Sequence, residues 1–583
     1  METTTSETNH TSQARNDLIR TISQSAVEQG GAPADHDQKQ TEVQPGRESF
    51  ETQHVNVEPS TNSPSDMEAI RTVSTQGPVY SVFTLPQKRF IVFMSAAGGF
   101  FSAISANIYF PALNALAAEF GVSASLINLT LTTYMIFQGF VPLLVGDLAD
   151  MAGRRPAYIF CFVIYIASNI GLALCPSYAA LLVLRCLQSS GSSTLIALGG
   201  GVVADVADVS ERGVWMGLNT AGPNVAPALG PVIGGVISQY LGWRWIFWFL
   251  LILSCAYMIP LVIFYPETSR NVVGNGSIPP QEWNQSLLNY LQVRRAAKAN
   301  AALKRTTTRE SQQSQKPMRR KLQFPNPLHG LRLLGEKDIG LLLLFNAIVF
   351  VCYYVTLATT PYLFAEIYGF NDLEVGLCFL PLGVGAILAP IINGNILDWN
   401  FRRTAKKLGL VVDRKRATDL TSFPLEKARM QVLMPFVFLC AIAVLIYGWI
   451  MHFNAPLPPA LVLQFVIGVS STASFGAMNV LLVDLQPKSP STVIAANNFC
   501  RCWVGAGATA LVIPAIEGLG TGGAFTLSAG LLLVCTPISW VLIKKGPGWR
   551  EERRVKVAKH REMKELKNEQ ERDTQLSTSD EKK

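Results

Sequence analysis

Residues 146–156 of this 583-residue chain read Gly146-Asp147-Leu148-Ala149-Asp150-Met151-Ala152-Gly153-Arg154-Arg155-Pro156. This stretch, called the first motif, places two carboxylates, two guanidinium groups and two glycines between two long apolar segments. A second motif follows another apolar segment and reads Gly394-Asn395-Ile396-Leu397-Asp398-Trp399-Asn400-Phe401-Arg402-Arg403. In this copy, Asn395 replaces the first Asp and Phe401 replaces the second Gly, so we expect it to act more weakly. The repetition predicts a chain built from two related halves.

The composition of the chain indicates a membrane protein. Apolar residues make up 49% of the sequence and charged residues 15%, whereas a soluble domain carries about 25% charged residues. Segment after segment exceeds the roughly 18 apolar residues that a helix needs to cross a bilayer. The predicted fold class is therefore all-α, a polytopic membrane protein. The ten cysteines are scattered and lie mostly in apolar segments, which favours packing over a disulfide framework.

The apolar segments predict twelve membrane spans in two groups of six. The first group covers roughly residues 90–113, 125–146, 157–175, 179–204, 213–240 and 245–265. The second group covers roughly residues 339–365, 373–397, 431–452, 458–483, 492–516 and 523–543. The predicted division is a disordered cytosolic tail (1–86), a first six-helix half (87–265), a cytosolic central loop (266–336), a second six-helix half (337–543) and a charged cytosolic tail (544–583). The last tail is expected to carry a surface helix from Trp549 to Arg572.

The distribution of basic residues predicts the orientation of the chain. The central loop and the loop after the eighth span are rich in Lys and Arg, whereas Arg244 is nearly the only basic residue of the short opposite loops. Basic loops stay on the cytosolic side, so both termini are predicted to be cytosolic. The same placement explains the net charge of +8 without a nucleic-acid partner. The central loop is interpreted as a linker facing anionic lipids, with a folded regulatory domain as the alternative.

The first motif has the features of a gate. Asp147 falls where the second span leaves the membrane, and Gly153 permits a tight reversal before the third span. A carboxylate at this edge can pair with a basic group of a neighbouring helix in one conformation and release it in another. The competing interpretation is a solvated turn with positive-inside arginines. The predicted gating or coupling residues are Gly146, Asp147, Asp150, Gly153, Arg154, Arg155, Asp398 and Arg402.

Residues 146–156 resemble the hallmark loop of the major facilitator superfamily, and Arg185-Cys186-Leu187-Gln188 resembles its Arg-x-x-Gln signature, although Ser189 stands where glycine is usual. The fifth span resembles the antiporter signature of proton-coupled exporters, with Ala226 at a position where glycine is usual. The matching residues are Gly217, Gly230, Pro231, Gly234 and Gly235. Segments 107–113 and 266–268 look like fungal twelve-span drug:proton antiporters, closest to the quinidine-resistance and citrate-exporter-like branch. This resemblance implies two six-helix bundles and export driven by proton entry, in the plasma membrane.

The fifth span also has a physical interpretation. Small residues recur at every fourth position and form one smooth face: Gly222, Ala226, Gly230 and Gly234. Such a face lets helix backbones approach closely. Prolines with the same spacing remove successive backbone donors and predict a bend: Pro223, Pro227 and Pro231. A bent, closely packed helix at the bundle interface would seal the cavity against leak, with packing alone as the alternative.

Two arginines are the sharpest candidates for a substrate site. Arg185 and Arg501 lie within apolar spans, where an ionised side chain is costly and turns toward a partner or a cavity. Their spans belong to different halves, as a midplane site between repeats requires. Each arginine shares a helix face with polar residues, and either could instead bind backbone carbonyls or snorkel. The predicted substrate-binding residues are Arg185, Gln188, Ser189, Ser192, Asn497, Asn498, Arg501 and Asn107.

The span interiors contain no central Asp or Glu. An organic acid such as citrate, or an acidic or neutral secondary metabolite, therefore fits better than an organic cation. The predicted function is export of such molecules by alternating access, coupled to protons. A multidrug or weak-acid efflux pump and a non-transporting nutrient sensor are the alternatives, and uniport and a vacuolar location stay open.

No nucleophile–base pair, metal cluster or phosphate loop stands out in the sequence, so neither an enzyme nor a cofactor nor a metal is expected. The expected partners are a small-molecule substrate, protons and membrane lipids, with no nucleic acid, and we expect a monomer. Other polar and aromatic residues of the spans are interpreted first as packing residues: Gln138, Asn219, Asn346, Gln464, Asn479, Tyr109, Tyr134, Tyr353 and Tyr354.

Overall fold

The computed structural model describes residues 80–580, with gaps at 208–210, 279, 292–293, 295–331, 408–423 and 487–489. Within these ranges the regular structure is helical, and it belongs to one compact unit, Gly77–Lys583. The predicted N-terminal tail (1–86) lies almost entirely outside the described residues, as does much of the predicted central loop (266–336).

The first half is formed by helices from Leu85 to Phe264. They are α3 (Leu85–Asn107), η1 (Phe110–Ala112), α4 (Leu113–Phe120), α5 (Ala124–Ala152), α6 (Arg154–Ala173), α7 (Tyr178–Ser192), α8 (Thr194–Val206), α9 (Arg212–Leu241) and α10 (Arg244–Phe264). The hydroxyls of Ser123 and Ser177 accept hydrogen bonds from backbone N–H groups in the first turns of α5 and α7, so ordinary N-caps begin both helices. The short elements α11 (Arg270–Val273) and η2 (Glu282–Asn284) follow α10.

The second half is formed by helices from Leu333 onward. Its elements are η3 (Leu333–Gly335), α14 (Lys337–Tyr368), α15 (Asp372–Cys378), α16 (Leu380–Lys407), α17 (Leu425–His452), α18 (Leu457–Leu485), α19 (Pro490–Cys535) and α20 (Pro537–Asp580). Gly520 has a positive φ of 73° and divides α19 between the eleventh and twelfth spans.

The prediction of twelve spans is confirmed. Among the described residues, ten segments are long and apolar enough to cross a membrane. One of these, Thr492–Lys556, contains both of the last two spans, because Gly520 separates them. The helix α9 is not among these ten segments, because its glycines, prolines and polar residues lower its mean hydropathy. Counting α9 and dividing the last segment at Gly520 gives twelve.

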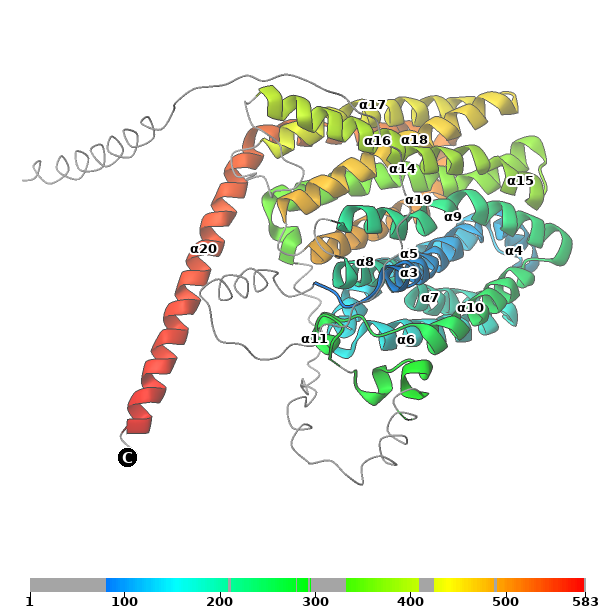
Figure 1. The fold of residues 1–583 in the computed structure, drawn as a ribbon. Coiled ribbons are helices and arrows are strands. Elements are labelled where there is room, and N and C mark those ends of the chain that lie inside the picture. Colours follow the sequence, from blue (N-terminus) through cyan, green and yellow to red (C-terminus); the bar gives the residue numbers. More distant parts are fainter. Residues whose placement is uncertain are drawn as a thin grey trace, which may run out of the picture. The chain divides into compact units, whose positions relative to one another are not determined.

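The C-terminal part departs from our expectation. We expected the last span to end near residue 543 and a separate surface helix to follow, but α20 continues without a break to Asp580 (Figure 1). Arg553 pairs with Glu336 at 3.1 Å and with Asp338 at 2.9 Å, and Arg550 pairs with Glu426 at 3.6 Å. These ion pairs fasten the first turns beyond the apolar residues to the beginnings of α14 and α17.

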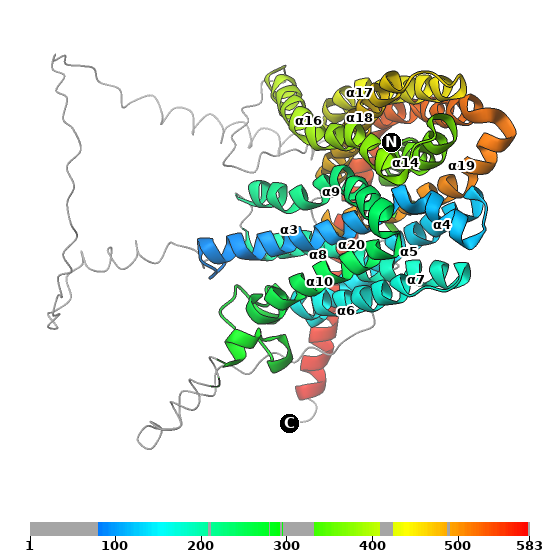
Figure 2. The same ribbon diagram turned by 90° about the vertical axis from the view of Figure 1, so that its right-hand side faces the viewer.

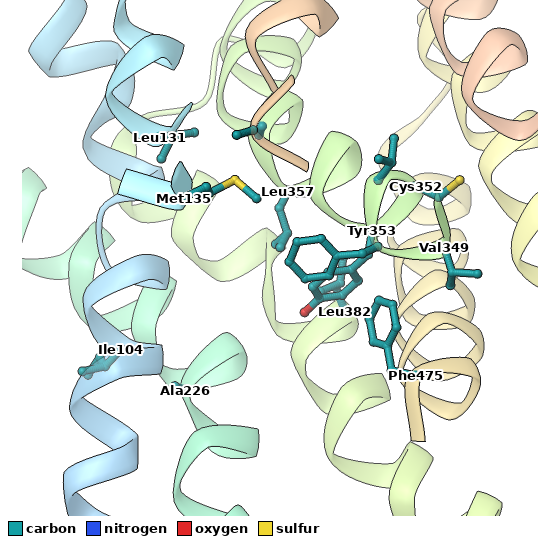
Figure 3. Packing of buried hydrophobic residues seen from close by; sticks show 14 of the residues in the cluster. Ile104, Leu131, Met135, Ala226, Val349, Cys352, Tyr353, Leu357, Leu382 and Phe475 are labelled. Carbon is teal, nitrogen blue, oxygen red and sulfur yellow. The ribbon is translucent and has the colours of Figure 1, made fainter. Parts of the chain in front are cut away.

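The two halves pack side by side, with α3–α10 next to α14–α19 (Figures 1 and 2). Between them, α5 packs along α19, and α9 packs along α15 and α16. The buried core draws side chains from both halves, among them Met135 and Ala226 of the first half and Leu382 and Phe475 of the second (Figure 3). We call the end of the spans where α5 meets α6 the motif end, and the opposite end the far end.

Candidate substrate site and gate

The first motif forms a tight turn between α5 and α6. After α5 ends at Ala152, Gly153 adopts a positive φ of 114°, and α6 begins at Arg154. A Cβ atom at Gly153 would collide with the carboxylate of Glu267, so both the backbone and the available space require glycine. A Cβ atom at Gly146 would meet open space. The side chain of Asp147 lies outside the described residues.

Arg154 is held between two carboxylates of the first half. Its Nη2 lies 2.6 Å from Asp150 Oδ1, and its Nε donates to Asp205 Oδ2 at 2.9 Å. Asp205 is close to the end of α8, so this pair joins the third and fourth spans. Arg155 has a different role, because its Nη2 donates to the backbone oxygen of Val262 at 2.9 Å. The first motif thus stabilises the motif end of its own half.

Sequence reasoning missed Glu267 as a partner of the first motif. Its carboxylate is 3% exposed and accepts hydrogen bonds from the backbone N–H groups of Arg154 (2.8 Å) and Arg155 (3.2 Å). The N–H groups of Thr268 and Ser269 donate to it as well. Burial raises the pKa of Glu267, while these hydrogen bonds act in the opposite direction. A carboxylate at the start of α6 also interacts favourably with the helix dipole. The available signal was Pro266-Glu267-Thr268, an acidic residue directly after an apolar segment.

The second motif does not form a turn. The helix α16 runs through it to Lys407, and both Asp398 and Arg402 are exposed. An ion pair equivalent to that of Arg154 exists elsewhere, between Arg429 Nη2 at the start of α17 and Asp484 Oδ2 at the end of α18, at 3.1 Å. The third and fourth spans of each half are therefore joined by an Arg–Asp pair, but in the second half the arginine lies outside the motif.

Arg185 is completely buried on α7. Its guanidinium lies over the rings of Tyr109 and Tyr134, at 4.1 and 4.2 Å from the ring centroids. Its Nη1 donates to Gln188 Oε1 at 2.5 Å and to the backbone oxygen of Ser105 at 3.5 Å. The Nε and Nη2 atoms have no hydrogen-bond partner. The charge is thus surrounded by aromatic faces and neutral dipoles.

The other predicted residues of α7 surround Arg185. Ser189 donates to the backbone oxygen of Tyr134 at 2.7 Å, and Ser192 Oγ lies 3.1 Å from the Tyr134 hydroxyl. Gln188 Nε2 donates to Asn169 Oδ1 at 2.8 Å. These residues and Arg185 therefore form one buried cluster. Asn169 escaped sequence reasoning because it is an isolated polar residue in an apolar span.

Arg501 lies on α19 against the aromatic rings of Phe350 and Phe475, at 4.8 and 5.7 Å from their centroids. Its Nη2 donates to Asn498 Oδ1 at 3.2 Å, and Asn498 Nδ2 donates across the interface to the backbone oxygen of Gln138 at 2.9 Å. Gln138 is one turn along α5 from Tyr134, which contacts Arg185. The two arginine clusters therefore contact α5 at levels about 6 Å apart along its axis.

Two predicted substrate residues have other partners. Asn497 donates to Asn479 Oδ1 and accepts from Asn346 Nδ2, both at 2.7 Å. Asn107 donates to the backbone oxygen of Ala103 on its own helix at 2.7 Å and packs against Gly230. Within the described residues, no group of three or more His, Cys, Asp or Glu side chains could hold a metal ion.

The helix α9 packs closely on two sides. Toward α3, Cβ atoms at Gly222, Gly230 and Gly234 would collide with residues 96 and 107–108. Toward the second half, a Cβ atom at Gly235 would lie 2.5 Å from the backbone oxygen of Asp372, and one at Gly376 would lie 2.5 Å from that of Pro231. Close backbone packing is thus present on both faces. Gly217 lies in open space and makes no such contact.

Comparisons with known proteins agree with this architecture. The family model of the Major Facilitator Superfamily matches residues 95–510. The chain belongs to this superfamily. It is therefore a membrane transporter and not an enzyme, with two six-helix bundles.

Fungal transporters are among its relatives. The chain is 44% identical over 82% of its length to the MFS-type transporter phiD of a fungal species, covering 71% of that protein. It is 33% identical over 85% of its length to citrate exporter 1 of Aspergillus niger, covering 92% of that protein. The fold matches the Escherichia coli xylose transporter XylE in a partially occluded inward open conformation. That match has a TM-score of 0.54 and 14% identity, and it covers 79% of this chain and 98% of that one.

Proposed function

We propose that this transporter exports small organic acids such as citrate, or acidic or neutral secondary metabolites, in exchange for protons. The observation that carries the proposal is the buried Arg185, whose Nε and Nη2 atoms lack a hydrogen-bond partner. Within the described part of the chain, its neighbours are two tyrosine rings, the amide of Gln188 and the backbone carbonyl of Ser105, and none of these is a carboxylate. A buried cation of this kind needs a counter-charge, and a planar carboxylate matches the geometry of guanidinium. The similarity to citrate exporter 1 supports the same class of substrate.

Contacts between the halves support alternating access. At the far end, Asn114 donates to the backbone oxygen of Pro361 at 2.8 Å, and Ser238 donates to the carboxylate of Asp372. Phe110 stacks on Phe379 at the same end, with ring centroids 5.8 Å apart. We propose that the motif end faces the cytosol in the plasma membrane. The substrate then reaches Arg185 from the cytosolic side. The reverse conformation then separates the far-end contacts and releases the substrate outside.

The test is transport by the purified full chain in proteoliposomes. Labelled citrate and a labelled lipophilic cation are offered separately, with and without an imposed pH gradient. We expect citrate to move, faster when protons flow in the opposite direction, and Arg185→Gln to lower the rate at least tenfold. Arg89→Gln, which changes an exposed arginine of α3 in the same way, is the matched control and should keep the wild-type rate. Movement of the cation without citrate would support a multidrug pump instead.

A further inference from the structure

The second motif borders a cavity between α16 and α17 at the motif end. The volume of this cavity is about 570 Å³. Both helices pack along α18 and make few contacts with each other, so a groove is left between the end of α16 and the start of α17 (Figure 2). We call this cavity the α16–α17 groove. Its lining includes three basic and three apolar side chains: Arg403, Lys407, Lys427, Ile396, Val432 and Phe436.

The outer end of the groove is basic, because the three cationic residues lie in the last turns of α16 and the first turn of α17. All three are exposed, and none of the described residues that line the groove is Asp or Glu. Asp398 lines an adjoining hollow, together with Arg402 and Lys406. Glu426, in the first turn of α17, is buried and pairs with Arg550 of α20. The N-terminus of α17 adds partial positive charge at this end. The outer end is therefore suited to an anion.

The same faces of both helices become apolar toward the middle of the spans. Residues three or four positions apart share one helix face. On α16, such a face carries Arg403, Trp399, Ile396, Ile392 and Leu388. On α17, it carries Lys427, Gln431, Pro435, Leu439 and Ile442. The side chains of Leu388, Ile392, Leu439 and Ile442 are exposed, although they lie within membrane spans. The basic end of the groove thus continues into a surface that faces the acyl chains of the bilayer.

Trp399 marks the boundary between the basic and the apolar parts. Its side chain is 59% exposed, and the guanidinium of Arg403 lies 5.2 Å from the centroid of its ring. Tryptophan is enriched at the depth where the polar headgroups of a membrane meet its hydrocarbon core. The headgroup level therefore coincides with the step from cationic to apolar side chains in the groove.

We propose that the α16–α17 groove binds an anionic phospholipid. The phosphate and the charged headgroup lie against Arg403, Lys407 and Lys427, and an acyl chain lies along the apolar faces of α16 and α17. This site gives the second motif a role different from that of the first motif. It is separate from Arg185 and depends on neither the substrate nor the direction of transport.

Other ligands match only part of the groove. A soluble anion such as inorganic phosphate would use the basic end and leave the apolar faces without a partner. A zwitterionic lipid would use the apolar faces, but its cationic headgroup would lie near three cationic side chains, where like charges repel. An anionic phospholipid matches both parts, and Lys and Arg near the membrane surface are attracted to such lipids.

The test measures lipid binding to the purified full chain in detergent by native mass spectrometry. Phosphatidylserine and phosphatidylcholine with identical acyl chains are titrated separately. We expect the wild-type protein to bind phosphatidylserine at least fivefold more tightly. The triple variant with Arg403→Gln, Lys407→Gln and Lys427→Gln should weaken phosphatidylserine binding at least tenfold and leave phosphatidylcholine binding unchanged.

The matched control removes the same charge from other helices. It combines Arg89→Gln of α3 with Lys545→Gln and Lys556→Gln of α20, three exposed residues that do not line the groove. We expect this control to retain the wild-type preference for phosphatidylserine. Equal weakening in both triple variants overturns the proposal, because that result indicates a general effect of net charge.

Two further results would also overturn the lipid site. One is equal wild-type affinity for the two lipids. The other is displacement of phosphatidylserine by an equal concentration of glycerophosphoserine or inorganic phosphate, since a site for soluble anions does not need acyl chains. If the triple variant does not fold, the three single variants are subject to the same criteria, each with a smaller expected loss. None of these measurements involves transport or Arg185, so their outcome is independent of the proposed export of organic acids.

Discussion

At the motif end of the first half, the chain reverses at Gly153, and Glu267 covers the start of α6. At the same end of the second half, α16 continues straight to Lys407, and the cationic side chains of Arg550 and Arg553 lie against the starts of α17 and α14. The segment that follows the last span of each half thus fastens the bundle in both cases, but with opposite charge. What the halves share is the Arg–Asp pair between their third and fourth spans. The comparison shows that a repeated contact need not be made by the repeated sequence: in the second half, the arginine of the Arg–Asp pair lies outside the second motif.

The largest expected effect comes from Arg154→Ala. Removing this guanidinium leaves Asp205 largely buried without its partner, which should destabilise the protein by about 3–5 kcal/mol. Thermal unfolding in detergent and the transport rate in proteoliposomes measure the effect. The same change at Arg402 should alter stability by less than about 0.5 kcal/mol, because that side chain is exposed. Equal effects at both arginines would refute the asymmetry between the motifs.

A smaller effect is expected from Gly153→Ala. The added methyl group collides with Glu267, and the positive φ is strained for alanine, so the loss of stability should be about 2–3 kcal/mol. Gly146→Ala is the matched control in the same motif, since a Cβ atom there meets open space within a helix. We expect that control to be neutral or slightly stabilising in thermal unfolding. If Gly153→Ala unfolds at the same temperature as the wild-type protein, the tight turn described at this position is contradicted.

Arg429→Ala tests whether the second half relies on its own Arg–Asp pair. The side chain of Asp484 is 22% exposed against 11% for Asp205, so solvent compensates more of the lost partner. The expected loss of stability is about 2 kcal/mol, below that of Arg154→Ala. Adding Asp484→Asn to the variant should recover part of it in the same unfolding assay. A loss as small as that of Arg402→Ala would mean that the pair contributes nothing.

The smallest effect concerns pH and Glu267→Gln. Burial raises the pKa of Glu267 above its ordinary value of 4.5, so the folded state binds a proton more readily than the unfolded state. Its contribution to stability is therefore greatest at low pH and is lost as pH rises through the folded pKa. Between pH 4 and pH 7 the wild-type protein should therefore lose more stability than the glutamine variant. An opposite sign in the difference between the two unfolding curves would show that the four N–H donors outweigh burial.

The sequence predicts the spans well because length and apolar composition are local properties. Eleven spans follow from such stretches, and the fifth is recognisable by its small residues although α9 is not apolar enough to be counted by hydropathy. The residues grouped around Arg185 were also predictable, because their spacing places them on one helix face.

Partners distant in the sequence were not predictable. Asp205, Glu267 and Asp484 each meet their arginine only after helices separated in the chain have packed together. The role predicted for Asp398 and Arg402 rested on similarity to the first motif, yet α16 runs through the second motif and both side chains are exposed. The unbroken α20 was missed for the same reason, since its ion pairs reach back about two hundred residues to Glu336 and Asp338.

The close packing of Gly235 against Asp372 and of Gly376 against Pro231 has a consequence for how such transporters diversify. At these two glycines the halves meet through backbone atoms, so no larger side chain fits there. With Arg185 as the proposed anion site, a change of substrate is expected to arise from the side chains around Arg185, whereas Gly235 and Gly376 tolerate no larger residue. The residues proposed to select the substrate are therefore separate from the residues at which the two halves pack backbone to backbone.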